Sequence, residues 1–214
     1  MITGDSRELA KGIPDASIDL VFCDPPYLRK NIDEGIYAWL AEEAARVLKP
    51  GGFCLAYCGT YYLHDAMMQM GQHLDYFWEY RILFRGSASV HYERRTIPAS
   101  TPVLAFRHGK KSLPHRAVLD VYKGSGADKA FHKWGQDAYS VQYYLDCFSR
   151  PGDVIWDPFA GGGTVPYVCK QLGRNFVAFE IDAAVADIAR KRIAIVQPRL
   201  MPESLIQAGL EIAG

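Results

Sequence analysis

Asp24, Pro25, Pro26 and Tyr27 combine groups suited to binding an amino group attached to a flat ring. The two consecutive prolines remove two N–H donors, so the backbone here offers carbonyl oxygens that can only accept hydrogen bonds. The carboxylate of Asp24 adds a further acceptor, and the ring of Tyr27 can stack on a planar group. These residue types predict a site for the exocyclic amine of a nucleobase.

A second candidate site is the glycine-rich run that begins at Asp157 and continues Pro158-Phe159-Ala160-Gly161-Gly162-Gly163-Thr164. Glycines permit positive φ angles and let a ligand approach the backbone closely. Glu180 ends the next apolar run, where an acid can hold two ribose hydroxyls. The G-x-G-x-x-G dinucleotide motif is missing, and the Asp157 carboxylate would repel a pyrophosphate. The pattern favours a cationic, phosphate-free nucleoside such as S-adenosylmethionine.

Each of these sites follows an apolar run typical of a buried parallel strand. Residues 18–23 precede Asp24, residues 154–156 precede Asp157, and residues 177–180 end in Glu180. Open α/β sheets bind ligands at the carboxyl ends of their strands. We therefore expect these acids to meet at one edge of a sheet.

The remaining pattern alternates strand-like and helix-like segments, which predicts an α/β fold of the doubly wound type with a mostly parallel sheet. We expect the strands 76–84 and 101–106 to pair as an antiparallel hairpin at the sheet edge. A turn at 49–52 ends the helix before it, and Tyr61 and Tyr62 are interpreted as helix packing residues rather than a base platform. Further strands are predicted at 2–3, 53–58 and near 118–122, and helices at 7–12, 31–48, 61–74, 138–149, 165–172 and 183–196.

The length of 214 residues fits one domain. We assign residues 1–200 to it, with a small insertion at about 85–130, and leave 201–214 as a tail. The five cysteines form no C-x-x-C pair, so buried free thiols are expected and no metal site. Without a long apolar run or a signal-like start, the sequence predicts a cytoplasmic protein that does not contact membranes.

The net charge is zero, but the charge is unevenly distributed. Residues 81–123 hold nine Lys and Arg and two acids, a net charge of +7, and the rest of the chain carries −7. We interpret the basic segment as a polyanion-binding surface beside a catalytic body. The alternative is a solvated basic loop.

The residues 24–27 and 157–164 together resemble the motifs of the DNA amino-methyltransferases, which transfer a methyl group from S-adenosylmethionine to adenine N6 or cytosine N4. The catalytic motif precedes the basic segment and the cofactor motif comes last, an order similar to that of the β group. The opening Gly4-Asp5-Ser6, the turn at 49–52 and Gly152-Asp153 also match. The resemblance spans residues 2 to about 195 and implies the fold of S-adenosylmethionine-dependent methyltransferases.

Carried over by position, the resemblance implies a catalytic corner of Asp24, Pro25, Pro26 and Tyr27, in which Asp24 and the Pro25 carbonyl hold the amine and Tyr27 stacks on the extruded base. It implies contacts to S-adenosylmethionine by Asp5, Asp24, Asp157, Phe159, Ala160, Gly161, Gly163, Thr164 and Glu180. DNA contacts are expected from the basic residues Arg85, Arg94, Arg95, Lys110, Lys111 and Arg116.

The expected activity is adenine-specific N6 methylation of DNA. Three alternatives stay open: cytosine N4 methylation, an RNA or protein amine methyltransferase, and a catalytically inactive DNA-binding module. Residues 132–137 depart from relatives that carry a H-P-T-Q-K-P-like stretch, because both prolines are missing. DNA is the expected partner, and a second copy of the chain and a cognate restriction endonuclease stay open.

Overall fold

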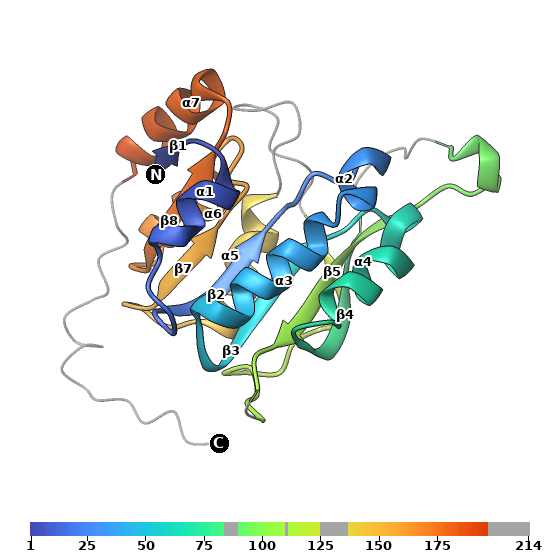
Figure 1. Cartoon of the computed structure of the whole chain (residues 1–214), viewed down its shortest axis with the longest axis horizontal. Coiled ribbons are helices and arrows are strands. Elements are labelled where there is room, and N and C mark those ends of the chain that lie inside the picture. The colour runs from blue at the N-terminus through green and yellow to red at the C-terminus, as the bar shows by residue number, and fades with distance from the viewer. Residues whose placement is uncertain (84–89, 110, 125–136, 197–214) are drawn as a thin grey trace.

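An eight-stranded sheet with helices on both faces organises the described residues, which are 1–83, 90–109, 111–124 and 137–196 of this computed structural model (Figure 1). The predicted α/β class is confirmed. The strand order is β1 (Ile2–Thr3), β8 (Asn175–Glu180), β7 (Val154–Asp157), β2 (Ile18–Cys23), β3 (Leu48–Tyr57), β5 (Ser100–Arg107), β4 (Asp75–Leu83) and β6 (Val121–Lys123).

The sheet is mostly parallel and doubly wound. From β2 the chain crosses to β3 on one side, whereas β7 and β8 extend the sheet on the other side. Only β5 pairs antiparallel with its neighbours among these strands. The strand order therefore reverses between β2 and β7, the place where open α/β sheets bind ligands.

Helices cover both faces of the sheet. The layer on one face packs through a cluster that includes Ile36, Leu40 and Ala66, and the other layer through a cluster that includes Val141 and Val168. The first layer is α1 (Ser6–Leu9), α2 (Arg29–Asp33), α3 (Ile36–Val47) and α4 (Leu63–Met70). The second contains α5 (Ala138–Phe148) and α6 (Thr164–Gln171), and α7 (Ala183–Ala194) packs on α6, β8 and β1.

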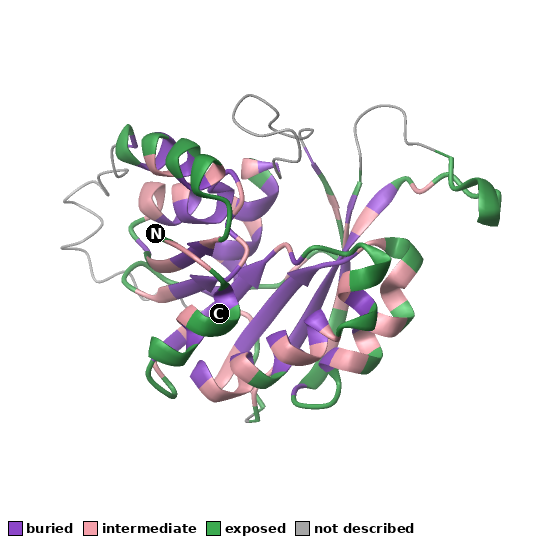
Figure 2. Cartoon of the chain, turned by 45° about the horizontal axis from the view of Figure 1, so that its top comes forward, coloured by how far each residue is buried: buried purple, intermediate pink, exposed green. Residues whose placement is uncertain are grey.

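Strand β2 is a continuous apolar run because helices cover both of its faces. Val21 and Cys23 pack in the α3 layer, whereas Leu20 and Phe22 pack in the α5 and α6 layer. Successive side chains of a strand point to opposite faces, so a central strand is buried on both (Figure 2).

Three sequence predictions need correction. The antiparallel hairpin of β4 and β5 exists, but it is not the edge, because β6 pairs with β4 in parallel outside it. The helix predicted at 31–48 is two helices, since Gly35 adopts a left-handed φ of 71° between them. The turn predicted at 49–52 lies inside β3, where the Gly51 N–H donates to the His108 carbonyl at 2.7 Å.

The five cysteines are buried and carry no disulfide, as predicted for free thiols. Among the described residues, none of the helices has the length and apolar character needed to cross a membrane. The same residues contain no cluster of His, Cys, Asp and Glu that could hold a metal ion. The predicted tail at 201–214 and the stretch at 132–136 lie outside the described residues.

Candidate functional site

The predicted acids meet at the carboxyl edge of the sheet. Strands β2 and β7 lie side by side with Val21 opposite Trp156, so Asp24 and Asp157 emerge next to each other. Strand β8 follows β7, and β1 follows β8 with Thr3 opposite Glu180. Segments far apart in the sequence thus converge on the point where the strand order reverses.

The glycine-rich turn is folded onto the end of β8 by the Glu180 carboxylate. The Gly161 N–H donates to Glu180 Oε2 at 2.8 Å, and the Asp182 N–H donates to Glu180 Oε1 at 2.9 Å. Gly161 has a φ of 49°, and a side chain added there would meet open space. The turn therefore leaves room for a ligand beside an acid.

Gly163 and Thr164 face the helix α7 instead. A Cβ on Gly163 would lie 2.8 Å from the Ala189 Cβ, so a side chain there would collide with α7. The buried Arg192 donates to Thr164 Oγ1 at 3.1 Å and to the Gly162 carbonyl at 3.3 Å. These contacts give Gly163 and Thr164 a packing role, and their cofactor contacts stay predictions.

Asp157 is the most buried acid of the site, at 3% exposure. Burial raises its pKa well above the usual range, while a hydrogen bond from the Phe159 N–H at 3.1 Å opposes that rise. The neighbouring charges of Asp24 and Glu180 raise the pKa further. A cationic ligand at this place would relieve the repulsion and favour the ionised carboxylate.

The segment around Asp5 closes the outer side of the site. The Gly4 N–H donates to the Glu180 carbonyl at 2.9 Å, and the Ser6 hydroxyl donates to the Pro158 carbonyl. Asp5 itself caps α1, accepting from the Arg7 N–H at 2.8 Å, and its side chain is exposed. The cap is the structural role that a Gly-Asp-Ser start can have, and a cofactor contact by Asp5 stays a prediction.

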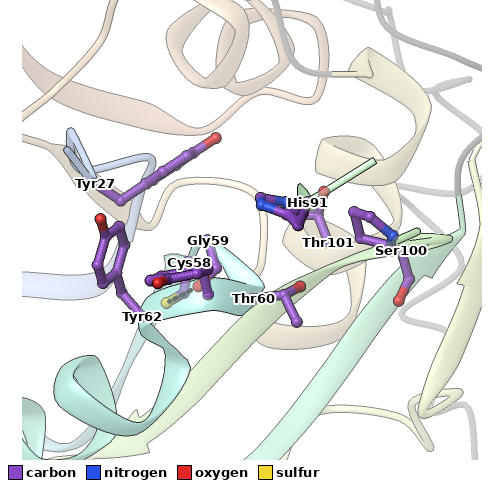
Figure 3. A pocket seen from close by; sticks show the side chains of 10 residues that line it. Tyr27, Cys58, Gly59, Thr60, Tyr62, His91, Ser100 and Thr101 are labelled. Carbon is purple, nitrogen blue, oxygen red and sulfur yellow. Dashed lines mark hydrogen bonds between the residues drawn. The ribbon is translucent and has the colours of Figure 1, made fainter. Parts of the chain in front are cut away.

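Tyr27 borders a cavity of about 280 Å³ at the end of β3 (Figure 3). Its ring lies close to the backbone at Gly59, where a Cβ would come 3.0 Å from Tyr27 Cδ2. Burial and the Asp24 charge raise the pKa of Tyr27, so its phenol stays neutral. The cavity is lined by Tyr27, Cys58, Gly59, Thr60, Tyr61, Tyr62, His91, Pro98, Ser100 and Thr101.

Sequence reasoning missed most of this lining. Tyr61 and Tyr62 are predicted to pack in a helix, but residues 60–62 form a short 3-10 helix before α4 and border the cavity. Tyr62 also packs against the core, as predicted. The available signal was an aromatic pair directly after a strand that ends beside the catalytic corner.

Two further buried tyrosines also escaped the sequence analysis. The Tyr57 and Tyr144 hydroxyls are buried without a hydrogen-bond partner among the described residues. Their rings pack around Phe22 of β2, at centroid distances of 5.7 and 6.1 Å. Burial, and then the charge of Asp24, raise the pKa of Tyr57, so its phenol stays neutral.

The structure divides the predicted basic surface. Arg94 and Arg95 follow His91, which lines the cavity, so they lie on the same side of the sheet as Asp24. Lys111 and Arg116 follow the end of β5, which runs antiparallel and finishes opposite the start of β3. They therefore lie near the amino ends of the parallel strands, away from the carboxyl ends that carry Asp24. There Arg116 Nε donates to the Asp146 carbonyl at 3.1 Å. Arg85 and Lys110 lie outside the described residues.

Comparison with known proteins points to one family. Residues 132–191 match a family model described as DNA methylase, which covers N6 and N4 enzymes. The type II methyltransferase M.HinfI of Haemophilus influenzae is 27% identical over 263 aligned positions, covering 99% of this chain and 72% of that protein. Since the alignment is longer than this chain, the relative carries inserted residues that are missing here.

Solved methyltransferases share the fold. M1.HpyAVI, solved in complex with S-adenosylmethionine, has a TM-score of 0.74 at 19% identity, covering 90% of this chain and 98% of that one. The cytosine-N4-specific PvuII DNA methyltransferase has a TM-score of 0.77 at 17% identity, covering 97% and 89%. The family model and these relatives make the chain similar to the N6/N4 DNA methylases, and the solved structures show that it has their fold.

Proposed function

We propose that the protein methylates the exocyclic N6 amine of adenine in DNA, using S-adenosylmethionine. The observation that carries the proposal is the juxtaposition of the Asp24–Tyr27 corner with the acidic, glycine-rich turn where the strand order reverses. This arrangement supports a transfer reaction because it offers adjoining places for an amine and for a methyl donor.

The turn fits S-adenosylmethionine chemically. The open space at Gly161, the Glu180 carboxylate beside it and the buried Asp157 supply acceptors for ribose hydroxyls and for an ammonium group. When bound, this cofactor supplies an electrophilic methyl group. We assign its contacts to Asp5, Asp24, Asp157, Phe159, Ala160, Gly161, Gly163, Thr164 and Glu180.

Asp24 and the Pro25 carbonyl prepare the amine. The amine of adenine is conjugated with its ring and is a poor nucleophile. Two acceptors that bind both N–H groups draw the nitrogen out of the ring plane and free its lone pair. Holding nitrogen and methyl carbon in line, about 3–3.5 Å apart, supplies the rest of the rate enhancement.

The target base must leave the duplex to reach this corner, at a cost of a few kcal/mol. Stacking on Tyr27 offsets part of that cost, by about 1–3 kcal/mol per base. The cavity beside Tyr27, about 280 Å³, adjoins the catalytic corner and is lined in part by aromatic side chains. Its position and its aromatic lining support the entry of one extruded base.

We further propose that residues 1–200 are one methyltransferase domain, with the insertion at about 85–130 serving target recognition. Phosphate contacts from Arg94 and Arg95 would position the duplex over the cavity. A second copy of the chain and a cognate endonuclease stay predictions from the resemblance.

Cytosine N4 methylation is the alternative product, because the same acceptors bind either amine. The PvuII enzyme, which is cytosine-N4-specific, shares the fold. Asp at position 24 favours adenine, since N4 relatives of this family more often carry Ser there.

The test is to incubate the purified chain with unmethylated DNA and S-adenosylmethionine, digest to nucleosides and identify methylated bases by mass spectrometry. N6-methyladenine that disappears with Asp24→Ala is the expected result. N4-methylcytosine would replace the proposed target, and no methylated base despite cofactor binding would reject DNA methylation by this chain alone.

A further inference from the structure

Three groups of one exposed loop meet on a single tyrosine at the border of the Tyr27 cavity. Glu93 Oε2 accepts a hydrogen bond from the Tyr61 hydroxyl at 2.9 Å. The Arg94 guanidinium carbon lies 4.8 Å from the centre of the Tyr61 ring, and the His91 ring is stacked near it at 6.0 Å. Tyr61 therefore fastens this loop to the body of the protein.

The loop has a defined conformation of its own. The His91 N–H donates to the Thr96 carbonyl at 2.9 Å, and the Thr96 hydroxyl donates to the Arg94 carbonyl at 2.9 Å. Residues 92–94 form a 3-10 turn between them. Backbone closure and the contacts with Tyr61 fix where His91 and Arg94 lie.

The cavity could receive the base of a nucleotide, and the Arg94 guanidinium beside it could bind the phosphate. Tyr61 and His91 both line the cavity that Tyr27 also borders. Arg94 is exposed, and cation–π contact with Tyr61 holds its guanidinium at this border without an ion pair among the described residues. A planar base fits the aromatic space, and a phosphate fits the guanidinium.

We infer that Tyr61, His91 and Arg94 form a clamp for the extruded nucleotide, in which Tyr61 and His91 wall in its base and Arg94 binds its phosphate. The inference rests on the proposed function, which supplies the extruded base, and assigns residues that the catalytic motif does not contain. It predicts that the chain prefers DNA in which a base is already unpaired, because flipping then costs little.

The experiment compares affinities for a paired duplex and for the same duplex with one bulged adenine, by fluorescence anisotropy without S-adenosylmethionine. Tyr61→Leu should lower the preference for bulged DNA by about five- to a hundredfold, the effect of losing one stacking contact. Tyr61→Phe keeps the ring and should retain most of the preference. Arg94→Gln should also lower the preference for bulged DNA. It should reduce the slope of log affinity against log salt concentration for bulged DNA by about 1.

Two neighbours serve as matched controls. Tyr92 is 85% exposed and does not line the cavity, and Arg95 is exposed. Tyr92→Leu and Arg95→Gln should leave the preference unchanged, even if they weaken binding to both DNAs equally. Equal effects of control and test variants on the preference would overturn the clamp, as would a wild-type protein with no preference for bulged DNA.

The nucleoside assay separates this inference from the proposed function. Methylation by the wild type with a preference that Tyr61→Leu and Arg94→Gln do not change would reject the clamp and keep the activity. A preference lost in both variants without any methylated base would support the clamp and reject the activity.

Discussion

At the scale of single residues, burial and the nearby charges of Asp24 and Glu180 disfavour the ionised form of Asp157 when no ligand is bound. Its pKa is raised in the folded protein, so the folded state holds its proton more tightly than the unfolded state, where the pKa is about 3.9. The stability that the neutral form provides is complete below about pH 4 and is lost as the pH rises through the folded pKa.

Asp157→Asn should therefore stabilise the ligand-free protein, increasingly so as the pH rises above about 4. The amide oxygen can still accept from the Phe159 N–H, so the local fold is kept. The measurement is thermal unfolding of both proteins between pH 4 and pH 8, with cofactor binding followed by calorimetry. We expect a higher melting temperature at neutral pH together with lost cofactor affinity. A temperature difference that does not change with pH would contradict the assignment.

Gly59 is a second residue with a local consequence. A Cβ at this position would lie 3.0 Å from Tyr27 Cδ2, so Gly59→Ala should displace the tyrosine ring. The ring has to move by a few tenths of an ångström. Since a misplacement of about 1 Å can cost about a hundredfold in rate, we expect a loss of up to about tenfold in methylation kcat/KM. Gly12→Ala is the control, because a Cβ there meets no atom within 4 Å. Equal rates for the two variants would exclude contact between Gly59 and the Tyr27 ring as a determinant of activity.

At the scale of elements, α7 packs against the glycine-rich turn through the contact of Ala189 with Gly163. Gly163→Ala places a Cβ against Ala189 at a φ of 75°, and should destabilise the protein by about 1–3 kcal/mol. Adding Ala189→Gly removes the collision but not the backbone strain, so the double variant should regain part of the loss. Urea unfolding of the single and double variants measures this coupling. If the losses of unfolding free energy caused by the two single substitutions simply added in the double variant, α7 would not pack against Gly163 as described.

The elements were predictable where the pattern is local. The apolar run of β2 and the strand, turn and helix around Asp157 predict their own structure, and sheet geometry then brings Asp24 and Asp157 together. The positions of Lys111 and Arg116 were not predictable in this way, because they depend on the direction of β5. The cavity wall at His91 depends on a contact with Tyr61, a residue 30 positions away with no shared pattern.

At the scale of the whole molecule, the two edges of the sheet should differ in their affinity for DNA. Lys123 is the last residue of β6 and lies opposite Leu83 of β4, so it is at the carboxyl ends of the strands, the side of the sheet that carries Asp24. Lys111 lies near the amino ends of the strands, on the other side. Lys123→Gln should weaken DNA binding and reduce its salt slope by about 1. Lys111→Gln should change neither, and affinity measured from low to high salt tests both. Matching losses in the two variants would favour a basic surface that wraps both edges.

The pairing of β1 with β8 has a consequence for the order of folding. Residues 2–6 contact Pro158 and Glu180, so this part of the sheet joins segments that a ribosome produces at very different times. Such contacts close long loops and form slowly. Strands β2 and β3 can pair while synthesis continues, but the acidic turn is completed only after β8 has emerged. We therefore expect nascent chains that stop before β8 to bind no methyl donor, which would keep partly made protein from modifying DNA.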